Sequence, residues 1–412
     1  MSAGVKVRMS DGPGQAGGEV LGRGHLPVLD GVRGLAILMV LVLHFVADTQ
    51  ATTRLERWIN LAAGWGQYGV DLFFVLSGFL ITGILFDARE SPDYFKNFYV
   101  RRVLRIFPLY YAVLAVLFLL LPLVPVLSSP TLDELRAHQA WAWLYGVNVF
   151  VAFRGEWALS YLDHFWSLSV EEHFYFVWPF VVWALARRPR VLLATSLGVA
   201  GAALLGRVAA AAAGVSPHVL YVLTPFRLDG LALGGAFAVL ARLPGGMARI
   251  RRLLPRLAAA AAALFLLRLA WSRLTPLWAA PLFQVRESLL VVLLACLLLR
   301  ALTAPRDALV VRLFSSRTMR WFGTYSYGLY VYHHFLSYHF AVHRTELALA
   351  ARLGSHGLAV ALQALVGVAI SCAVAFASYH LLEKRFLALK DRLTGSARPR
   401  PSAALGVAGP PA

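Results

Sequence analysis

The sequence predicts an all-α, polytopic integral membrane protein with about ten transmembrane helices. Among its 412 residues, 59% are hydrophobic and 15% are charged, and the mean hydropathy is +0.65. Soluble globular domains carry roughly 25% charged residues, so this composition is typical of a protein that lies in a bilayer. The net charge of +18 would suit a nucleic-acid-binding protein. However, no basic domain or RNA-binding aromatic motif accompanies it, and no nucleic acid is expected as a partner.

Ten apolar segments are each near the roughly twenty residues needed to cross a bilayer. They lie at 30–47, 68–86, 106–127, 165–186, 191–213, 219–241, 257–272, 282–302, 321–340 and 357–382. The stretch 139–153 is shorter and rich in aromatic residues. If this stretch lies on the outer interface, the inner segments hold 27 Lys and Arg residues and the outer loops hold 7. This positive-inside bias predicts that both termini are cytoplasmic.

The predicted organisation is one membrane domain over residues 29–390 between two disordered cytoplasmic tails, 1–28 and 391–412. The first apolar run lacks a small-residue cleavage site, so we expect a transmembrane helix there and no cleavable signal. Cys296 and Cys372 are far apart and give neither a disulfide framework nor a metal-ligand spacing. His339 and His343 have the spacing of a zinc pair but lack the glutamate of a metalloprotease motif, so no metal is expected.

The first predicted span carries a cation near its start, Arg33, and an imidazole near its end, His44. Eleven residues separate them, which on a helix places both on nearly the same face, about 16 Å apart along the axis. Ionisable groups within a membrane-length apolar run usually face a bundle interior and are candidates for function. The alternative is a snorkelling arginine and a hydrogen-bonded core histidine.

Further ionisable residues mark the second span and the first inner loop. Asp71 lies near the outer end of the second span, where it could act in function or as a helix cap. Arg101, Arg102 and Arg105 precede the third span and can converge on phosphate groups. Their alternative role is that of a positive-inside anchor.

Four later spans also carry polar groups. Glu171 and Glu172 lie about two turns into the fourth span, and at least one of them should face a polar cavity. Arg227 and Asp229 in the sixth span are either functional or part of a structural ion-pair network. For Arg286 and Glu287 in the eighth span, a structural ion pair is the expected role. His333 and His334 lie in the middle of the ninth.

Motifs in a fixed order along the chain give it a resemblance to the acyltransferase-3 family of integral membrane O-acyltransferases. The match covers nearly all of residues 27–390. Any one motif would be weak, but their joint occurrence in order is specific. They are Leu-Asp-Gly-x-Arg-Gly at 29–34 with His44, Val-Asp-Leu-Phe-Phe-Val-Leu-Ser-Gly-Phe-Leu at 70–80, Arg-Arg-x-x-Arg-Ile-x-Pro at 101–108, Trp-Ser-Leu-Ser-Val-Glu at 166–171, Phe-Arg-Leu-Asp-Gly at 226–230, Ser-Tyr-x-Leu-Tyr-x-x-His at 326–333 and Glu-Lys-Arg-Phe at 383–386.

The resemblance implies transfer of an acyl group, often acetyl, from acyl-coenzyme A to a hydroxyl of a sugar, glycan or glycosylated natural product such as a macrolide antibiotic. Acyl-coenzyme A would be a co-substrate, with no cofactor bound. The implied location is a bacterial inner membrane. The departures from the family pattern are His173, where Gln is frequent, and Tyr332, where Trp is frequent. Both could bear on the choice of acceptor.

The resemblance maps the family's essential arginine and histidine onto Arg33 and His44, its inner-loop arginines onto Arg102 and Arg105, and its membrane glutamate onto Glu171. Together with the other ionisable positions described above, these give the candidate site residues. His44, Glu171 and Asp71 are the catalytic candidates. Arg33, Arg102 and Arg105 are the candidates for coenzyme A binding, and Arg227, Asp229 and His333 are those for acceptor binding. His44 would act as general base, with Glu171 stabilising its imidazolium. An acyl-histidine intermediate is the alternative chemistry.

Two other classes of protein are alternatives to an O-acyltransferase. A transporter or flippase for a glycan or drug could also have ten spans with buried charges, but inverted repeats and paired broken helices are not apparent. A membrane scaffold without catalysis would leave the alignment of Arg33 with His44 unexplained. Binding of coenzyme A separates these readings. The sequence leaves the acceptor, the acyl chain length and the oligomeric state open.

Overall fold

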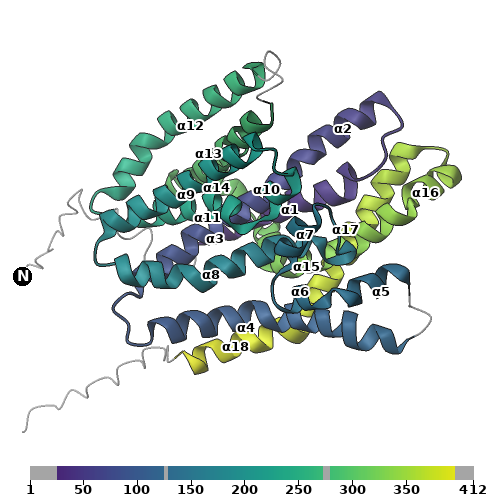
Figure 1. Ribbon diagram of the computed structural model, residues 1–412, viewed down its shortest axis with the longest axis horizontal. Coiled ribbons are helices and arrows are strands. Elements are labelled where there is room, and N and C mark those ends of the chain that lie inside the picture. Colours follow the sequence, from purple (N-terminus) through teal and green to yellow (C-terminus); the bar gives the residue numbers. More distant parts are fainter. Residues whose placement is uncertain (1–25, 125–128, 272–278, 395–412) are drawn as a thin grey trace, which may run out of the picture. The chain divides into compact units, whose positions relative to one another are not determined.

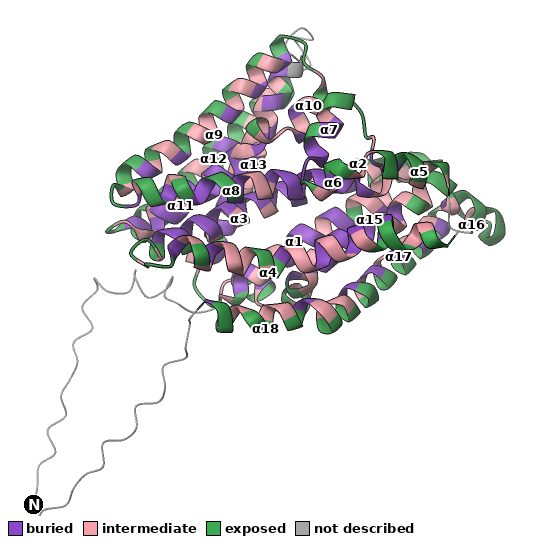
Figure 2. Cartoon of the chain, turned by 60° about the horizontal axis from the view of Figure 1, so that its bottom comes forward, coloured by how far each residue is buried: buried purple, intermediate pink, exposed green. Residues whose placement is uncertain are grey.

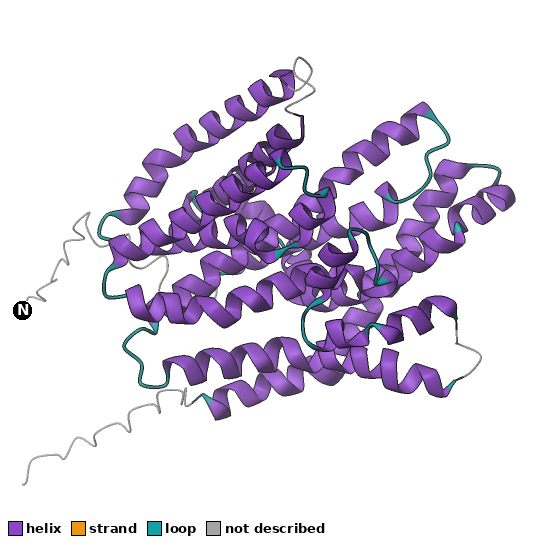
Figure 3. Cartoon of the chain, viewed as in Figure 1, coloured by secondary structure: helices purple, strands orange, loops and turns teal. Residues whose placement is uncertain are grey.

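The computed structural model describes residues 26–124, 129–271 and 279–394, where every regular element is a helix (Figure 3). This confirms the predicted all-α class. Eight helical stretches in this part of the chain are long and apolar enough to cross a membrane. The two remaining expected spans correspond to α8 (Trp166–Leu185) and α15 (Arg317–His343). Both are long enough to span, but their glutamates, histidines and tyrosines lower the hydropathy.

The predicted terminal tails lie mostly outside the described residues. Pro27 and Val28 already belong to α1 (Pro27–Val42), and α18 (Lys384–Leu393) continues past residue 391. The eight candidate spans are Pro27–Ala47, Arg54–Asp87, Tyr94–Leu123, Pro189–Ala212, Pro217–Arg242, Gly246–Ala270, Pro281–Thr303 and His356–Lys390.

The chain divides into two compact units, and α1, α8 and α15 contribute residues to both. Unit 1 comprises residues 1–40, 66–86 and 173–324. Besides parts of the shared helices, its helices (Figure 1) are α3 (Tyr68–Asp87), α9 (Pro189–Ala212), α10 (Pro217–Val222), α11 (Thr224–Arg242), α12 (Gly246–Trp271), α13 (Ala279–Thr303) and α14 (Leu309–Phe314).

Unit 2 comprises residues 41–65, 87–172 and 325–412. Its own α-helices are α2 (Arg54–Gly64), α4 (Tyr94–Ala115), α5 (Pro130–Ala137), α6 (Gln139–Trp143), α7 (Val147–Arg154), α16 (Thr345–Leu353), α17 (His356–Ser378) and α18. The π-helical turns η1 (Leu43–Ala47), η3 (Val116–Leu120) and η8 (Tyr379–Glu383), with the 3₁₀ segments η4 (Leu121–Leu123) and η6 (Ser160–Phe165), complete it.

Helix α3 is the most deeply buried helix of unit 1, and Figure 2 shows it largely in the colour of buried residues. Glycines on α3 and on the neighbouring α11 explain how the two helices come so close. A Cβ atom built on Gly78 would lie 1.8 Å from the backbone oxygen of Leu231, and one on Gly234 would lie 2.1 Å from that of Val75. Such small residues let two helix backbones touch, which is a common basis of helix association in membranes.

The stretch 139–153 forms two short helices, α6 with 5 residues and α7 with 8. Both are far shorter than a membrane span, in agreement with the prediction that this stretch does not cross the bilayer. The predicted outer loop 48–64 instead contains a helix, α2. A capping box fixes its start, because Thr53 accepts a hydrogen bond from the Glu56 backbone while Glu56 accepts one from the Thr53 backbone.

Candidate active site

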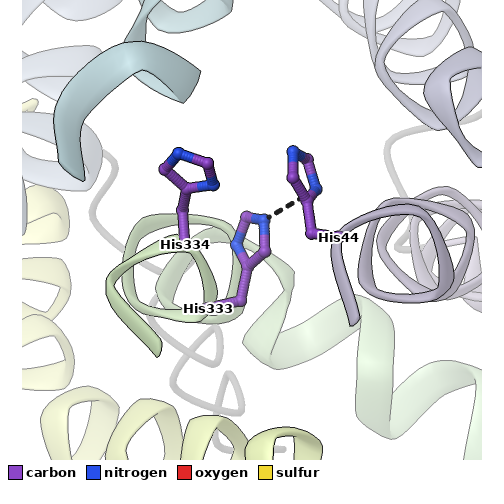
Figure 4. Close-up of side chains that lie close together, drawn as sticks. All are labelled: His44, His333 and His334. Carbon is purple, nitrogen blue, oxygen red and sulfur yellow. Dashed lines mark hydrogen bonds between the residues drawn. The ribbon is translucent and has the colours of Figure 1, made fainter. Parts of the chain in front are cut away.

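His44 is the predicted catalytic residue, and it lies in the π-helical turn η1 that continues α1. Single π-helical turns are rare and occur frequently at functional sites. The His44 ring meets two imidazoles of α15, those of His333 and His334, with ring centroids 5.0 Å away in each case. Figure 4 shows the three rings together. The structure therefore brings the expected base of the first span next to the histidine pair of the ninth.

One of these contacts is a hydrogen bond, between Nδ1 of His44 and Nε2 of His333 at 3.3 Å. The His333 side chain is completely buried. Suitable ligand nitrogens of His44, His333 and His334 all lie within 4.8 Å of one another, so these residues could also hold a metal ion. No metal-ligand spacing could be recognised in the sequence here, because the histidines come from two distant segments of the chain.

A fourth histidine, His164 of η6, completes the cluster. Its ring centroid lies 4.6 Å from that of His334, and its Nε2 donates a hydrogen bond to the backbone oxygen of Val331 at 3.2 Å. Burial lowers the pKa of His164 well below its ordinary value, and the three neighbouring histidines lower it further. His164 is therefore neutral at physiological pH. Sequence reasoning did not single it out, although it directly follows Asp163 at the start of the fourth predicted span.

The turn that carries His164 is anchored at several points. Asp163 accepts a hydrogen bond from the Leu159 backbone at 2.8 Å. Burial raises the pKa of Asp163 to about 7, although nearby backbone N–H groups oppose that rise. Tyr330 donates its hydroxyl hydrogen to the His164 oxygen at 2.8 Å, and the Ser167 hydroxyl lies 2.5 Å from that of Tyr330. These bonds hold η6 against α15.

Asp48 is a second residue that sequence reasoning missed. It lies one helical turn after His44, at the end of η1. Desolvation raises the pKa of the Asp48 carboxyl, and its interaction with His44 partly offsets that rise. Asp48 therefore lies within electrostatic reach of the His44 imidazole.

Glu171 and Glu172 follow on α8. Glu172 interacts electrostatically with Arg102 of α4 and with Glu171. Two stacked tyrosines, Tyr110 and Tyr145, lie near Glu172, with ring centroids 4.2 Å apart. The contact of Glu171 with His44 that the sequence suggests stays a prediction.

The predicted coenzyme A-binding arginines lie in both units. Arg33 belongs to unit 1 and pairs with Asp30 at 3.3 Å, with a quarter of its side chain exposed. Arg102 and the exposed Arg105 belong to unit 2, and Arg105 interacts electrostatically with Glu383 of η8. The convergence of all three on one ligand stays a prediction.

The remaining predicted residues form buried ion pairs within unit 1. Asp71 of α3 accepts a hydrogen bond from Arg227 of α11 at 2.6 Å, and neither side chain is more than 4% exposed. Asp229 accepts one from Arg207 of α9 at 2.6 Å and one from Ser288 of α13 at 2.9 Å. Arg227 and Asp229 thus each form an ion pair with a residue of another helix.

The Arg286–Glu287 pair, expected to be structural, lies in the same unit. Its two side chains are 2.8 Å apart, and the Tyr68 hydroxyl donates to Glu287 at 2.8 Å. These contacts join α13 to the start of α3.

A family model described as "Acyltransferase domain" matches residues 26–380. The chain is also similar to the "Peptidoglycan O-acetyltransferase OatA" of Listeria monocytogenes, with 29% identity over 335 residues that cover 76% of this chain and 49% of that protein. It is 29% identical over 383 residues to the "Putative peptidoglycan O-acetyltransferase YrhL" of Bacillus subtilis, covering 87% and 54% of the two chains. The similarity to the "O-acetyltransferase OatA" of Staphylococcus aureus is 30% over 180 residues, covering 42% and 27%.

The chain spans about half the length of the first two relatives. No solved structure matches it.

Proposed function

Because the chain belongs to the acyltransferase-3 family, we propose that it is a membrane O-acyltransferase that moves a short acyl group, such as acetyl, from acyl-coenzyme A to a carbohydrate hydroxyl. Two relatives carry the name of peptidoglycan O-acetyltransferases, which supports a glycan as the acceptor. A glycosylated small molecule such as a macrolide offers the same type of hydroxyl. The eight long apolar helices support a multi-pass membrane location, for which we propose the bacterial inner membrane.

The observation that carries the chemistry is the position of His44 in a cluster of imidazoles, of which those of His333 and His164 are buried. His44 would take the proton of the acceptor hydroxyl while the hydroxyl oxygen forms a bond to the acyl carbonyl carbon. The carbon–sulfur bond then breaks, and the proton passes from the His44 imidazolium to the leaving thiolate. Coenzyme A leaves as a thiol, so atoms and charge balance. General base catalysis of this kind typically contributes about 10²–10⁴ in rate.

A charged partner would stabilise the His44 imidazolium as it forms. We propose Glu171 for this role because it lies within the apolar α8, where a carboxylate is stabilised by a positively charged partner. Asp48 supports the same chemistry through its interaction with His44.

The donor would be held by the arginines Arg33, Arg102 and Arg105. Guanidinium groups bind phosphate and diphosphate in a fork geometry. The exposure of Arg105 and the partial exposure of Arg33 leave both accessible to a water-soluble donor. We also propose that Asp71, Arg227 and Asp229 help to bind the acceptor, through a polar region that their ion pairs create inside unit 1.

The test is release of free thiol by purified protein in detergent, supplied with acetyl-, propionyl- or longer acyl-coenzyme A. Release should depend on added glycan or macrolide and should be lost in His44→Ala. As a matched control, His380→Ala removes a histidine of η8 whose ring packs on Phe376 of α17, and it should keep its activity. Failure of every donor to bind or react would refute the proposed function.

A further inference from the structure

The hydrogen bonds of His333 determine which of its nitrogens carries a proton. Its Nδ1 lies 3.0 Å from the backbone oxygen of Leu329 and 2.8 Å from that of Tyr330. A carbonyl oxygen can only accept a hydrogen bond, so Nδ1 of His333 must be the N–H donor. Both carbonyls belong to the preceding turn of α15, which makes this arrangement a property of the helix itself.

Burial then determines the state of the second nitrogen. The His333 side chain is 0% exposed, and an imidazolium at such a position would carry a large desolvation cost. A neutral imidazole has one N–H donor and one acceptor nitrogen. Nε2 of His333 is therefore the acceptor, and it lies 3.3 Å from Nδ1 of His44. Figure 4 shows this bond between the two rings.

We propose that His333 is a positioning residue that holds His44 in the tautomer with the proton on Nδ1, so that Nε2 of His44 is the nitrogen that acts as base. This inference rests on the proposed function of His44, and it gives His333 a role other than acceptor binding. When His44 becomes an imidazolium, its Nδ1–H bond to a neutral acceptor remains and strengthens, because hydrogen bonds to charged groups are roughly twice as strong. No proton needs to move to His333.

The other groups that face His44 are compatible with this role. The rings of His334 and His44 meet edge-to-face, at an interplanar angle of 78°. The His164 ring contacts His334, with the two centroids 4.6 Å apart. Asp48 follows at the end of η1 and interacts electrostatically with His44. In the tautomer assigned here, a neutral imidazole accepts the hydrogen bond that orients His44, whereas in the serine hydrolase triad a carboxylate accepts it.

Two variants of His333 separate positioning from mere packing. His333→Gln places an amide oxygen where Nε2 was, so it can still accept from His44. His333→Leu fills the space and accepts nothing. We expect kcat to fall by about 10²-fold or more in His333→Leu and by less than about tenfold in His333→Gln, with KM changed little in either. Equal losses in the two variants would overturn the proposal.

The tautomer itself is measured without any substrate. In protein labelled with ¹⁵N-histidine, magic-angle-spinning NMR distinguishes a protonated ring nitrogen from a bare one, and the His44→Ala spectrum assigns the signals. We expect a protonated Nδ1 and a bare Nε2 on His44 in the wild type and in His333→Gln, and a mixture of tautomers in His333→Leu. A protonated Nε2 in the wild type refutes the inference, whether or not the protein transfers acyl groups.

The same three rings could instead bind a metal ion, and the experiment includes that outcome. Elemental analysis of the purified wild type should find less than stoichiometric zinc, copper, iron or nickel. One equivalent of such a metal, lost in His333→Leu, would mean that Nε2 of His333 is a ligand and would overturn the positioning role. An inactive protein with the expected tautomer and no metal would refute the proposed function while leaving the tautomer assignment intact.

Discussion

The guanidinium of Arg227 is almost completely buried, and the carboxylate of Asp71 that pairs with it is equally buried. Two charges in such a place stabilise each other only as a pair, because either one alone would carry an uncompensated desolvation cost. Arg227 also lies over the Tyr221 ring, 5.0 Å from its centroid. The pair therefore ties α3 to α11 across the interior of unit 1.

Removing the cation should destabilise the protein more than removing the pair. Arg227→Met leaves Asp71 buried and unpaired, and we expect it to lower the free energy of unfolding by about 3 kcal/mol. Adding Asp71→Leu should recover most of that loss. The measurement is denaturant unfolding in detergent, with the exposed Arg190→Met as the control. A single variant as stable as the wild type would contradict the structural role of the pair.

Individual candidate residues could be recognised from the sequence, but their partners could not. Arg33 and His44 follow from helical spacing within one apolar run. The contact of His44 with His333 joins positions 289 residues apart, and no periodic pattern reports on such a pair. His164 and Asp48 were missed for a related reason, since each gains importance only from the rings beside it.

The crossing of α3 and α11 depends on glycine at both contact points. Because a Cβ on Gly78 would meet the Leu231 backbone oxygen at 1.8 Å, Gly78→Ala forces the two backbones apart. We expect the free energy of unfolding to fall by about 1–3 kcal/mol, as for other overpacked cores. The thermal midpoint in detergent measures the effect.

The matched control is Gly198→Ala on α9, where a Cβ would meet nothing within 4 Å. Alanine is the better helix former by about 1 kcal/mol, so this variant should be unchanged or slightly more stable. Equal destabilisation by both substitutions would show that the α3–α11 contact is not the cause.

The order and type of the helices were largely predictable, because long apolar runs leave the backbone few alternatives in a bilayer. The charge bias correctly predicted that 139–153 does not form a membrane-spanning helix. What the apolar pattern could not show was helix α2 within a segment expected to be a loop. Its signal was local, the Thr53-x-x-Glu56 capping box.

For the chain as a whole, the prediction that matters is its orientation in the membrane. We expect Arg249→Cys, in an inner segment, to react with a membrane-impermeant maleimide only in inside-out vesicles. Glu134→Cys, on α5, should react in intact spheroplasts. Both positions are exposed, and Cys296 and Cys372 would first be replaced by alanine. The opposite labelling pattern would invert the topology and contradict the positive-inside assignment.

Transfer of a labelled acetyl group tests the central claim most directly. Purified protein in detergent would be incubated with [¹⁴C]acetyl-coenzyme A and soluble peptidoglycan fragments, and the label on the glycan would be followed by chromatography and removed by mild base as an ester. We predict base-labile label on the glycan with the wild type, and at least about 10²-fold less with His44→Ala at equal protein folding. Undiminished transfer by His44→Ala would contradict the assignment of His44 as the base.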